Sequence, residues 1–266
     1  MPTLTAYSDF APQPRVKVEI PAAELDPSAS TLTVIQVSDI GEIEVRDGID
    51  KPAAGGVVVT DFEVPWGRVV TYQARQYDAV GAFIGVTASA DVTVNVELGV
   101  VCFSDPFSPA RAVAVRAGRS FAGELVEPRE VQRYQVGRSS IALMSELMPL
   151  TGVPLNVVTL TDAEAAQLRD VLQQGLVLVR SMPQLGLPGL LFVSVGGVPR
   201  RLVGHPSGRQ ERVWPLVGDE VRRPLLATIE PAVTWQRYVD AFVTWQDMID
   251  AYPTWFDAIS NPPPEA

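Results

Sequence analysis

The first third of the chain alternates between apolar and polar positions with a period of two. One run places Val16, Val18 and Ile20 on one side and Lys17 and Glu19 on the other, which is typical of a half-buried strand. Similar runs recur about every ten residues between turn sequences. The expected strands cover residues 15–20, 31–37, 41–45, 56–62, 69–76, 82–86 and 91–96. This spacing predicts an antiparallel sandwich.

The middle of the chain contains one clear helical pattern, over residues 162–174. Thr161 is a suitable N-cap, and Glu164 three residues later completes a capping box in which its carboxylate returns to the cap amide. Gly175 suits the left-handed position that ends a helix. One apolar stripe is expected from Ala165, Leu168, Val171 and Leu172.

Short β patterns surround this helix. They cover residues 112–116, 131–136, 155–160, 176–180, 190–195, 213–217 and 225–229. The pattern predicts one helix inserted in an otherwise antiparallel barrel or sandwich.

The last part of the chain repeats a ten-residue unit three times. The units are Val233–Phe242, Val243–Tyr252 and Pro253–Pro262, and each has Thr-Trp at its second and third positions. A continuous helix would turn successive Trp residues about 80° away from each other. The repeat therefore predicts three short helices, each restarted at its Thr.

Residues at fixed positions of the unit indicate how these helices begin and pack. Thr244 and Thr254 have Asp247 and Asp257 three residues later, an acidic form of the capping box. Within a unit, the Trp and the apolar residues four and seven positions later are expected on one face. The candidate interface residues are Trp235, Val239, Phe242, Trp245, Ile249, Tyr252, Trp255 and Ile259.

Helices of about eight residues are marginal alone, and three Trp side chains expose a large apolar area. The tail must therefore pack on a surface. Two alternatives remain open: a clasp on the chain's own second domain, or docking on another subunit.

Charge divides the chain into the same three regions. Residues 1–98 carry 6 basic and 14 acidic residues, residues 99–228 carry 14 and 11, and residues 229–266 carry 1 and 6. We expect a β-sandwich domain over 1–98, a barrel-like domain over 99–228 and the short-helix repeats over 229–266. The net-basic middle region is where an acidic partner could dock.

Composition narrows the function. The 266 residues have a net charge of −10, one Cys and one His, which argues against a nucleic-acid binder, an intrachain disulfide and a Cys-based or multi-His metal site. No apolar run reaches the roughly 18–20 residues of a membrane span. The N-terminus lacks the pattern of a signal peptide, so we expect a soluble protein.

No constellation of catalytic residues stands out. His205 lies in a turn with Ser207 too close in sequence to form a triad with it. Cys102 lies in an apolar run and is interpreted as a small buried hydrophobe. We expect no catalytic, cofactor-binding or metal-binding residues and no enzymatic activity. A glycosidase with two dispersed carboxylates stays open as an alternative.

Residues 63–75, EVPWGRVVTYQAR, resemble the stretch of fibronectin type III modules in which a Pro-Gly turn leads into a strand bearing a Tyr. The resemblance implies that Tyr72 pins a corner between strands and that Trp66 packs near the turn. The alternative is that both are ordinary core aromatics.

Residues 61–72, 160–168 and 212–216 together with the three Thr-Trp units resemble minor tail proteins of long-tailed bacteriophages that infect actinobacteria. The resemblance implies a structural, non-enzymatic tail-tip component of the virion, assembled in the host cytoplasm. It implies several copies, as a trimer or hexamer, contacts with other tail-tip proteins, and a middle domain similar to the ring-forming barrel of distal tail proteins. The alternative is a host-surface module in which exposed Trp66 or Tyr77 stacks on cell-wall glycan.

Overall fold

The computed structural model describes residues 1–129, 131–136, 139–146, 148–202, 211–224, 238–239, 241–242, 244–252, 258 and 263. The fold is mainly β, with several antiparallel sheets. The chain divides into two compact units. The first comprises Met1–Val96, Pro106–Ala110 and Leu225–Ala266, and the second Glu97–Asp105 and Arg111–Pro224. The separate region predicted for residues 229–266 stays a prediction, because most of these residues lie outside the described ranges.

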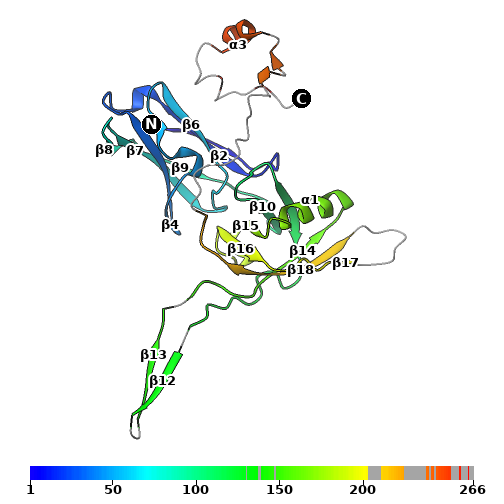
Figure 1. Cartoon of the computed structure of the whole chain (residues 1–266). Coiled ribbons are helices and arrows are strands. Elements are labelled where there is room, and N and C mark those ends of the chain that lie inside the picture. Colours follow the sequence, from blue (N-terminus) through cyan, green and yellow to red (C-terminus); the bar gives the residue numbers. More distant parts are fainter. Residues whose placement is uncertain are drawn as a thin grey trace. The chain divides into compact units, whose positions relative to one another are not determined.

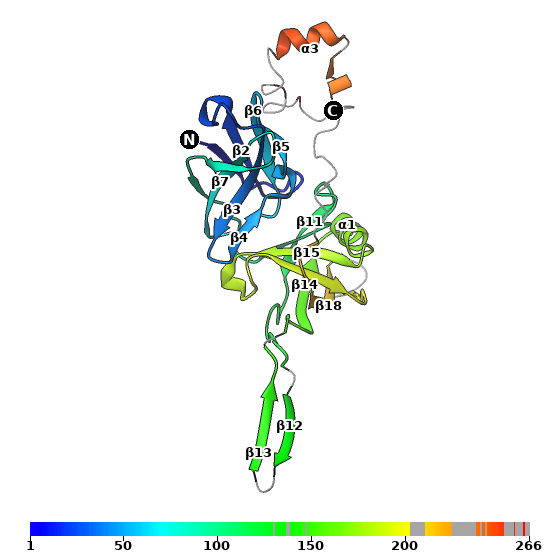
Figure 2. The same ribbon diagram turned by 60° about the vertical axis from the view of Figure 1, so that its left-hand side comes forward.

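The first unit contains two antiparallel sheets (Figure 2). One has the order β1-β2-β6, and the other has the order β4-β3-β7-β8, with β5 beside β3 and β9 beside β7. The strands are β1 (Thr3–Tyr7), β2 (Arg15–Pro21), β3 (Thr31–Ser38), β4 (Gly41–Glu44), β5 (Lys51–Pro52), β6 (Gly56–Asp61), β7 (Val69–Tyr77), β8 (Phe83–Val86) and β9 (Ala90–Thr93). Two 3-10 turns, η1 (Ala22–Glu24) and η2 (Arg46–Gly48), lie between strands.

The period-two pattern places the core of this unit. Val16, Val18 and Ile20 on β2 are fully buried, as predicted, while Lys17 and Glu19 are only partly buried and form an ion pair at 2.9 Å. All seven predicted strands of the first region are present within a few residues. β1 and β5 were not predicted, since short edge strands carry little alternation.

The corner between β6 and β7 is held by buried polar groups. The Tyr72 hydroxyl donates a hydrogen bond of 2.6 Å to Asp61 Oδ2, and Asp61 Oδ1 accepts the Glu63 amide at 2.8 Å. Arg46 Nε and Nη2 both donate to Glu63 Oε1, at 3.0 and 2.7 Å. Tyr72 therefore links the two strands as predicted, and Trp66 is fully buried near the turn, with an edge contact to Phe10.

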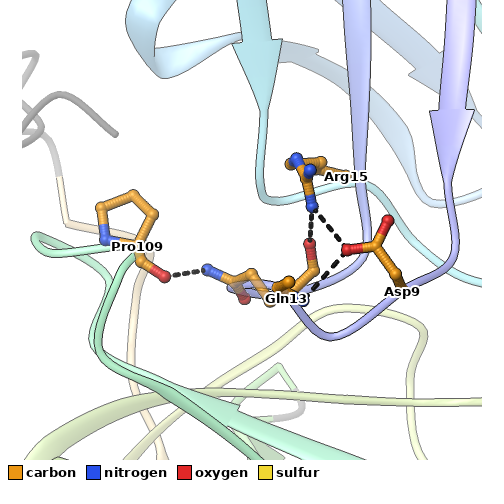
Figure 3. A network of polar contacts seen from close by, with 5 residues as sticks. Asp9, Gln13, Arg15 and Pro109 are labelled. Atoms are coloured by element: carbon orange, nitrogen blue, oxygen red, sulfur yellow. Dashed lines mark hydrogen bonds and ion pairs between the residues drawn. The ribbon is translucent and has the colours of Figure 1, made fainter. Parts of the chain in front are cut away.

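The turn between β1 and β2 is tied down by a small polar network (Figure 3). Arg15 Nη1 donates to Asp9 Oδ1 at 3.2 Å and to the Gln13 carbonyl at 3.1 Å. The buried Gln13 amide donates from Nε2 to the Pro109 carbonyl at 3.0 Å. This contact joins β2 to Pro106–Ala110, the later segment that belongs to the same unit.

The second unit contains a closed barrel (Figure 1). Among the described residues, six antiparallel strands pair in the order β14-β11-β10-β15-β16-β18, and β18 pairs back to β14, which closes the ring. The short β17 (Arg201–Leu202) adds to β18. The barrel strands are β10 (Val100–Ser104), β11 (Ala112–Ala117), β14 (Val153–Thr159), β15 (Leu176–Ser181), β16 (Leu191–Val195) and β18 (Arg212–Glu220).

Helix α1 (Asp162–Leu172) packs on the barrel core through its predicted stripe of Ala165, Leu168, Val171 and Leu172, all buried. Thr161 caps it, with Oγ1 accepting the Glu164 amide at 3.1 Å. The Glu164 carboxylate, however, accepts the amide of Leu160 at 2.7 Å and not that of the cap residue, so the predicted reciprocal bond is shifted by one residue. Gly175 has the expected positive φ of 74°.

Three further elements complete the second unit. β12 (Val131–Val136) and β13 (Ser139–Met144) form a two-stranded sheet of their own (Figure 2). The 3-10 turn η3 (Pro183–Leu185) follows β15. The predicted strand over residues 225–229 lies outside the described residues.

Candidate docking surface

The second decapeptide unit forms helix α3 (Trp245–Ala251). Thr244 is its N-cap: Oγ1 accepts the Asp247 amide at 3.2 Å, and Asp247 Oδ2 accepts the Thr244 amide at 2.9 Å. This is the acidic capping box predicted for this unit. The corresponding pair in the third unit, Thr254 and Asp257, lies outside the described residues.

The described residues of the tail share a small apolar cluster that we call the inner cluster. Its buried members are Tyr238, Met248 and Ala258, and Phe242 and Tyr252 pack against them. The Tyr252 ring makes edge contacts with Phe242 at 5.7 Å and with Tyr238 at 6.5 Å between centroids. The Tyr238 hydroxyl donates to the Ala258 carbonyl at 2.8 Å. Residues from all three units therefore meet in one cluster.

The apolar face predicted for the second unit is buried only in part. Tyr252 packs in the inner cluster, but Trp245 and Ile249 are 63% and 56% exposed, and Val239 of the first unit is 64% exposed. On a helix, the sixth and tenth positions of a unit lie about 60° and 20° to one side of the Trp, and the seventh about 40° to the other. The stripe is thus wide enough for one half to pack inward while the other half stays in solvent.

The eight candidate residues therefore separate into three groups. Phe242 and Tyr252 face the inner cluster, and Val239, Trp245 and Ile249 form an exposed set that we call the outer set. Trp235, Trp255 and Ile259 lie outside the described residues.

Sequence reasoning missed the sixth position of the unit. Tyr238, Met248 and Ala258 recur ten residues apart and are the buried members of the inner cluster. The available signal was the i, i+4 relation between the sixth and tenth positions, seen here as hydrogen bonds from the Phe242 amide to the Tyr238 carbonyl and from the Tyr252 amide to the Met248 carbonyl.

The outer set lies in an acidic setting. Asp247 and Asp250 are exposed on the same short helix, and Asp250 Oδ1 accepts Gln246 Nε2 at 2.8 Å. Residues 229–266 carry six acidic residues against one Arg. The surface can therefore offer apolar contact area to a partner together with a negative field, which favours a basic partner.

The aromatic residues considered for glycan stacking differ in their access to solvent. Trp66 is fully buried, so the predicted exposed Trp66 is wrong. Tyr77 is partly exposed and contacts the Phe83 ring edge-on at 6.1 Å. Phe83 and Val80, at the β7–β8 hairpin, are 60% and 88% exposed. These apolar side chains form the exposed end of the first unit's second sheet.

The described residues hold little reactive chemistry. Burial raises the pKa of the Cys102 thiol to about 11, although nearby Arg180 opposes the shift, so this buried Cys is a neutral thiol as interpreted from its apolar surroundings. His205 and Ser207 lie outside the described residues. Within the described ranges, no three His, Cys, Asp or Glu side chains are grouped to hold a metal ion.

Among the helices that the structure describes, none combines the length and the apolar character that crossing a membrane requires.

Comparisons of the chain with protein-family models, with curated proteins and with solved structures find no match.

Proposed function

We propose that this chain is a structural, non-enzymatic component of a bacteriophage tail tip that docks on neighbouring tail-tip proteins through the outer set of its C-terminal repeats. It assembles in the host cytoplasm in several copies, as a trimer or hexamer, and ends in the virion. The observation that carries the proposal is the exposure of Trp245 and Ile249, which lie one turn apart on α3, because large apolar side chains grouped on a surface mark interaction sites. Val239 of the first unit is exposed as well.

The repeat itself supports docking. A single short helix buries too little area for stable association, whereas a sequence that repeats the Trp at the same position of three units can multiply the contact. The inner cluster holds the units together, so the outer set is displayed by a folded element. This arrangement lowers the ordering cost of binding.

We also propose that residues 1–98 are an Ig-like sandwich of the fibronectin type III kind. The sheet orders β1-β2-β6 and β4-β3-β7-β8 support this assignment, since such modules pack one sheet of three strands on one of four. The bond from Tyr72 on β7 back to Asp61 at the end of β6 supports it as well. We propose that the barrel of the second unit takes the ring-forming role that the tail-tip resemblance implies.

A particle-incorporation assay tests the function. The variant gene is supplied in the host during infection by a phage that lacks it. The double variant Trp245→Ser/Ile249→Ser is then expected to be missing from purified particles, because it removes the apolar contact without changing the inner cluster. Val80→Ser, which removes an 88% exposed apolar side chain elsewhere, is the matched control and is expected to be incorporated normally. Normal incorporation of the double variant contradicts the proposal.

A second candidate is a host-surface module that binds cell-wall glycan, favoured by the exposed Phe83 next to Tyr77. Aromatic rings with accessible faces and edges offer stacking area to sugar rings. Full-length protein with Tyr77→Ala/Phe83→Ala is expected to lose co-sedimentation with purified actinobacterial cell walls, while Trp245→Ser/Ile249→Ser keeps it. This candidate is contradicted if the wild-type protein and the two double variants sediment equally with the cell walls, or if none of the three sediments with them.

A further inference from the structure

The outer wall of the barrel carries an apolar strip along β14 and β18, which lie side by side (Figure 1). Val153, Leu155 and Val157 of β14 and Trp214 and Leu216 of β18 face the core. Residues between them alternate to the outside. The outward residues, which we call the outer strip, are the apolar Pro154, Val158, Val213, Pro215 and Val217, with Leu160 just beyond β14. Asn156 lies among them opposite Pro215, and Asp219 follows at the end of the β18 row.

The strand register brings these residues together in rows. Pro154 pairs with Val217 and Val158 pairs with Val213, and directly opposed residues share a face. Val217 and Leu160 are 54% and 44% exposed. Pro154, Val158, Val213 and Pro215 are partly exposed, so part of the strip's apolar area is accessible.

Arginines close both ends of one row. Arg116 on β11 pairs with Val158, and Arg201 on β17 pairs with Val213. The row thus reads Arg116, Val158, Val213, Arg201 across four strands, with both arginines exposed. Arg116 contacts Glu97 at 2.6 Å, an exposed pair that solvent weakens.

The chemistry of the strip is the complement of the tail's outer set. The strip is apolar with basic ends, and the outer set is apolar with Asp247 and Asp250 beside it. The two regions differ in net charge, +3 for residues 99–228 (14 basic minus 11 acidic) and −5 for residues 229–266 (1 basic minus 6 acidic). Opposite charge around matched apolar areas is the arrangement that steers and orients association.

We propose that the outer set of one copy docks on the outer strip of a second copy of this chain. The inference rests on the proposed function in that it names the partner of the same tail surface. One Trp can bury on the order of 150–250 Å², and a standard interface takes about 800 Å² from each partner. Binding therefore needs all three repeats to engage.

Such a contact is heterologous, since two different surfaces of the chain meet. Repeated from copy to copy, it closes into a ring where the rotation allows, and otherwise it extends as a filament. The tail then acts as the connector between successive barrels, and each copy uses one outer set and one outer strip.

Mixing two full-length variants tests this contact. The tail variant is Trp245→Ser/Ile249→Ser, and the strip variant is Arg201→Glu/Val217→Glu. Both carry changes at exposed positions, so folding is checked by circular dichroism and by an unchanged unfolding midpoint. Analytical ultracentrifugation over a concentration series measures association, with Val80→Ser as the control for loss of exposed apolar area.

We expect the wild-type chain and Val80→Ser to self-associate and each double variant to weaken association by about thirtyfold or more, as truncation of a central interface anchor does. The mixture of the two double variants regains a dimer, because the tail of the strip variant still fits the strip of the tail variant. A monomeric mixture, or a strip variant that associates like wild type, overturns the proposal.

The outcome is separable from that of the proposed function. If the wild-type chain stays monomeric in solution while loss of the outer set still prevents incorporation into particles, the second copy is not the partner and the docking role stands. If both double variants are incorporated normally while self-association follows the expected pattern, the contact between copies exists and docking on neighbouring tail-tip proteins through the outer set fails.

Discussion

The barrel and the C-terminal tail treat their apolar residues in opposite ways. The barrel gathers its large side chains, such as Trp214, into one core with α1, where most are fully buried. Among the described residues of the tail, Tyr238, Met248 and Ala258 are buried in one small cluster, while Val239, Trp245 and Ile249 are each more than half exposed. A closed barrel has an interior in which every second residue of its strands is buried. A seven-residue helix such as α3 has no interior of its own. The barrel is therefore stabilised by its own core, whereas the exposed apolar side chains of the tail can contact a partner.

Truncating one core residue in each region gives the largest contrast. Trp214 is fully buried, and its Nε1 donates to Thr159 Oγ1 at 3.0 Å. Trp214→Ala is expected to lower the free energy of unfolding of the barrel by about 3–5 kcal/mol. Met248→Ala is expected to leave it unchanged, because Met248 belongs to the separate inner cluster. Urea unfolding followed by far-UV circular dichroism measures both.

An equal loss of barrel stability in the two variants would break the comparison. It would mean that the tail and the barrel unfold as one cooperative unit. Near-UV circular dichroism of Met248→Ala provides the positive control, since the contacts among Tyr238, Phe242 and Tyr252 must still respond to the lost side chain.

The sheets of the first unit bury a charged pair, whereas the described acidic residues of α3, Asp247 and Asp250, are exposed. The Arg46–Glu63 pair in the first unit has side chains only 2% and 5% exposed. Glu63→Gln is expected to cost about 3–5 kcal/mol, because the Arg46 charge stays buried without its carboxylate. Asp47→Asn, which breaks the exposed Lys51–Asp47 pair at 2.9 Å, is the control and is expected to cost less than about 1 kcal/mol.

Chemical denaturation at neutral pH measures this pair of variants. Replacing both partners, in Arg46→Met/Glu63→Leu, is expected to recover part of the loss because neither charge of the pair then stays buried without its partner. A Glu63→Gln protein as stable as Asp47→Asn would show that the pair does not support the β6–β7 corner.

The same cap substitution in two helices sharpens the comparison further. Thr161 and Thr244 each accept the amide three residues later, at 3.1 and 3.2 Å. Thr161→Ala is expected to lower barrel stability by about 1 kcal/mol, since α1 packs on the core. Thr244→Ala is expected to speed amide exchange within Trp245–Ala251 with no change in the global unfolding midpoint. A global shift from Thr244→Ala would contradict a locally stable tail.

An element of the fold can be predicted from the sequence when it has one buried and one exposed face. β2 and β7 alternate because one side meets the core, and both were predicted. β10 was missed because all five residues of Val100–Ser104 are buried, so no period remains to be seen. Helix α1 was predicted from its N-cap Thr161, its apolar stripe and the Gly175 that follows it, and the structure has all three.

The candidate site could be predicted only in part, because its packing depends on residues of different units. The repeat and the Thr244–Asp247 capping box follow from local spacing. Which half of the apolar stripe packs inward is decided by the other two units, and no single unit encodes it. The role of Tyr72 was predicted from the resemblance of residues 63–75 to fibronectin type III modules, whereas its partner Asp61 lies 11 residues upstream, with nothing in the spacing to mark it.

The protonation of Cys102 gives the smallest predicted effect. It tests how well the folded barrel excludes water from the Cys102 thiol on β10. Burial raises its pKa from 9.0 to about 11. Between these values the unfolded chain releases the thiol proton and the folded chain keeps it, so the free energy of unfolding falls as pH rises. From about pH 8 to pH 9.5 the loss is expected to be under about 1 kcal/mol. Cys102→Ala removes it, and urea midpoints of both proteins across this range measure the difference. Parallel pH profiles would show that water reaches the thiol in the folded barrel.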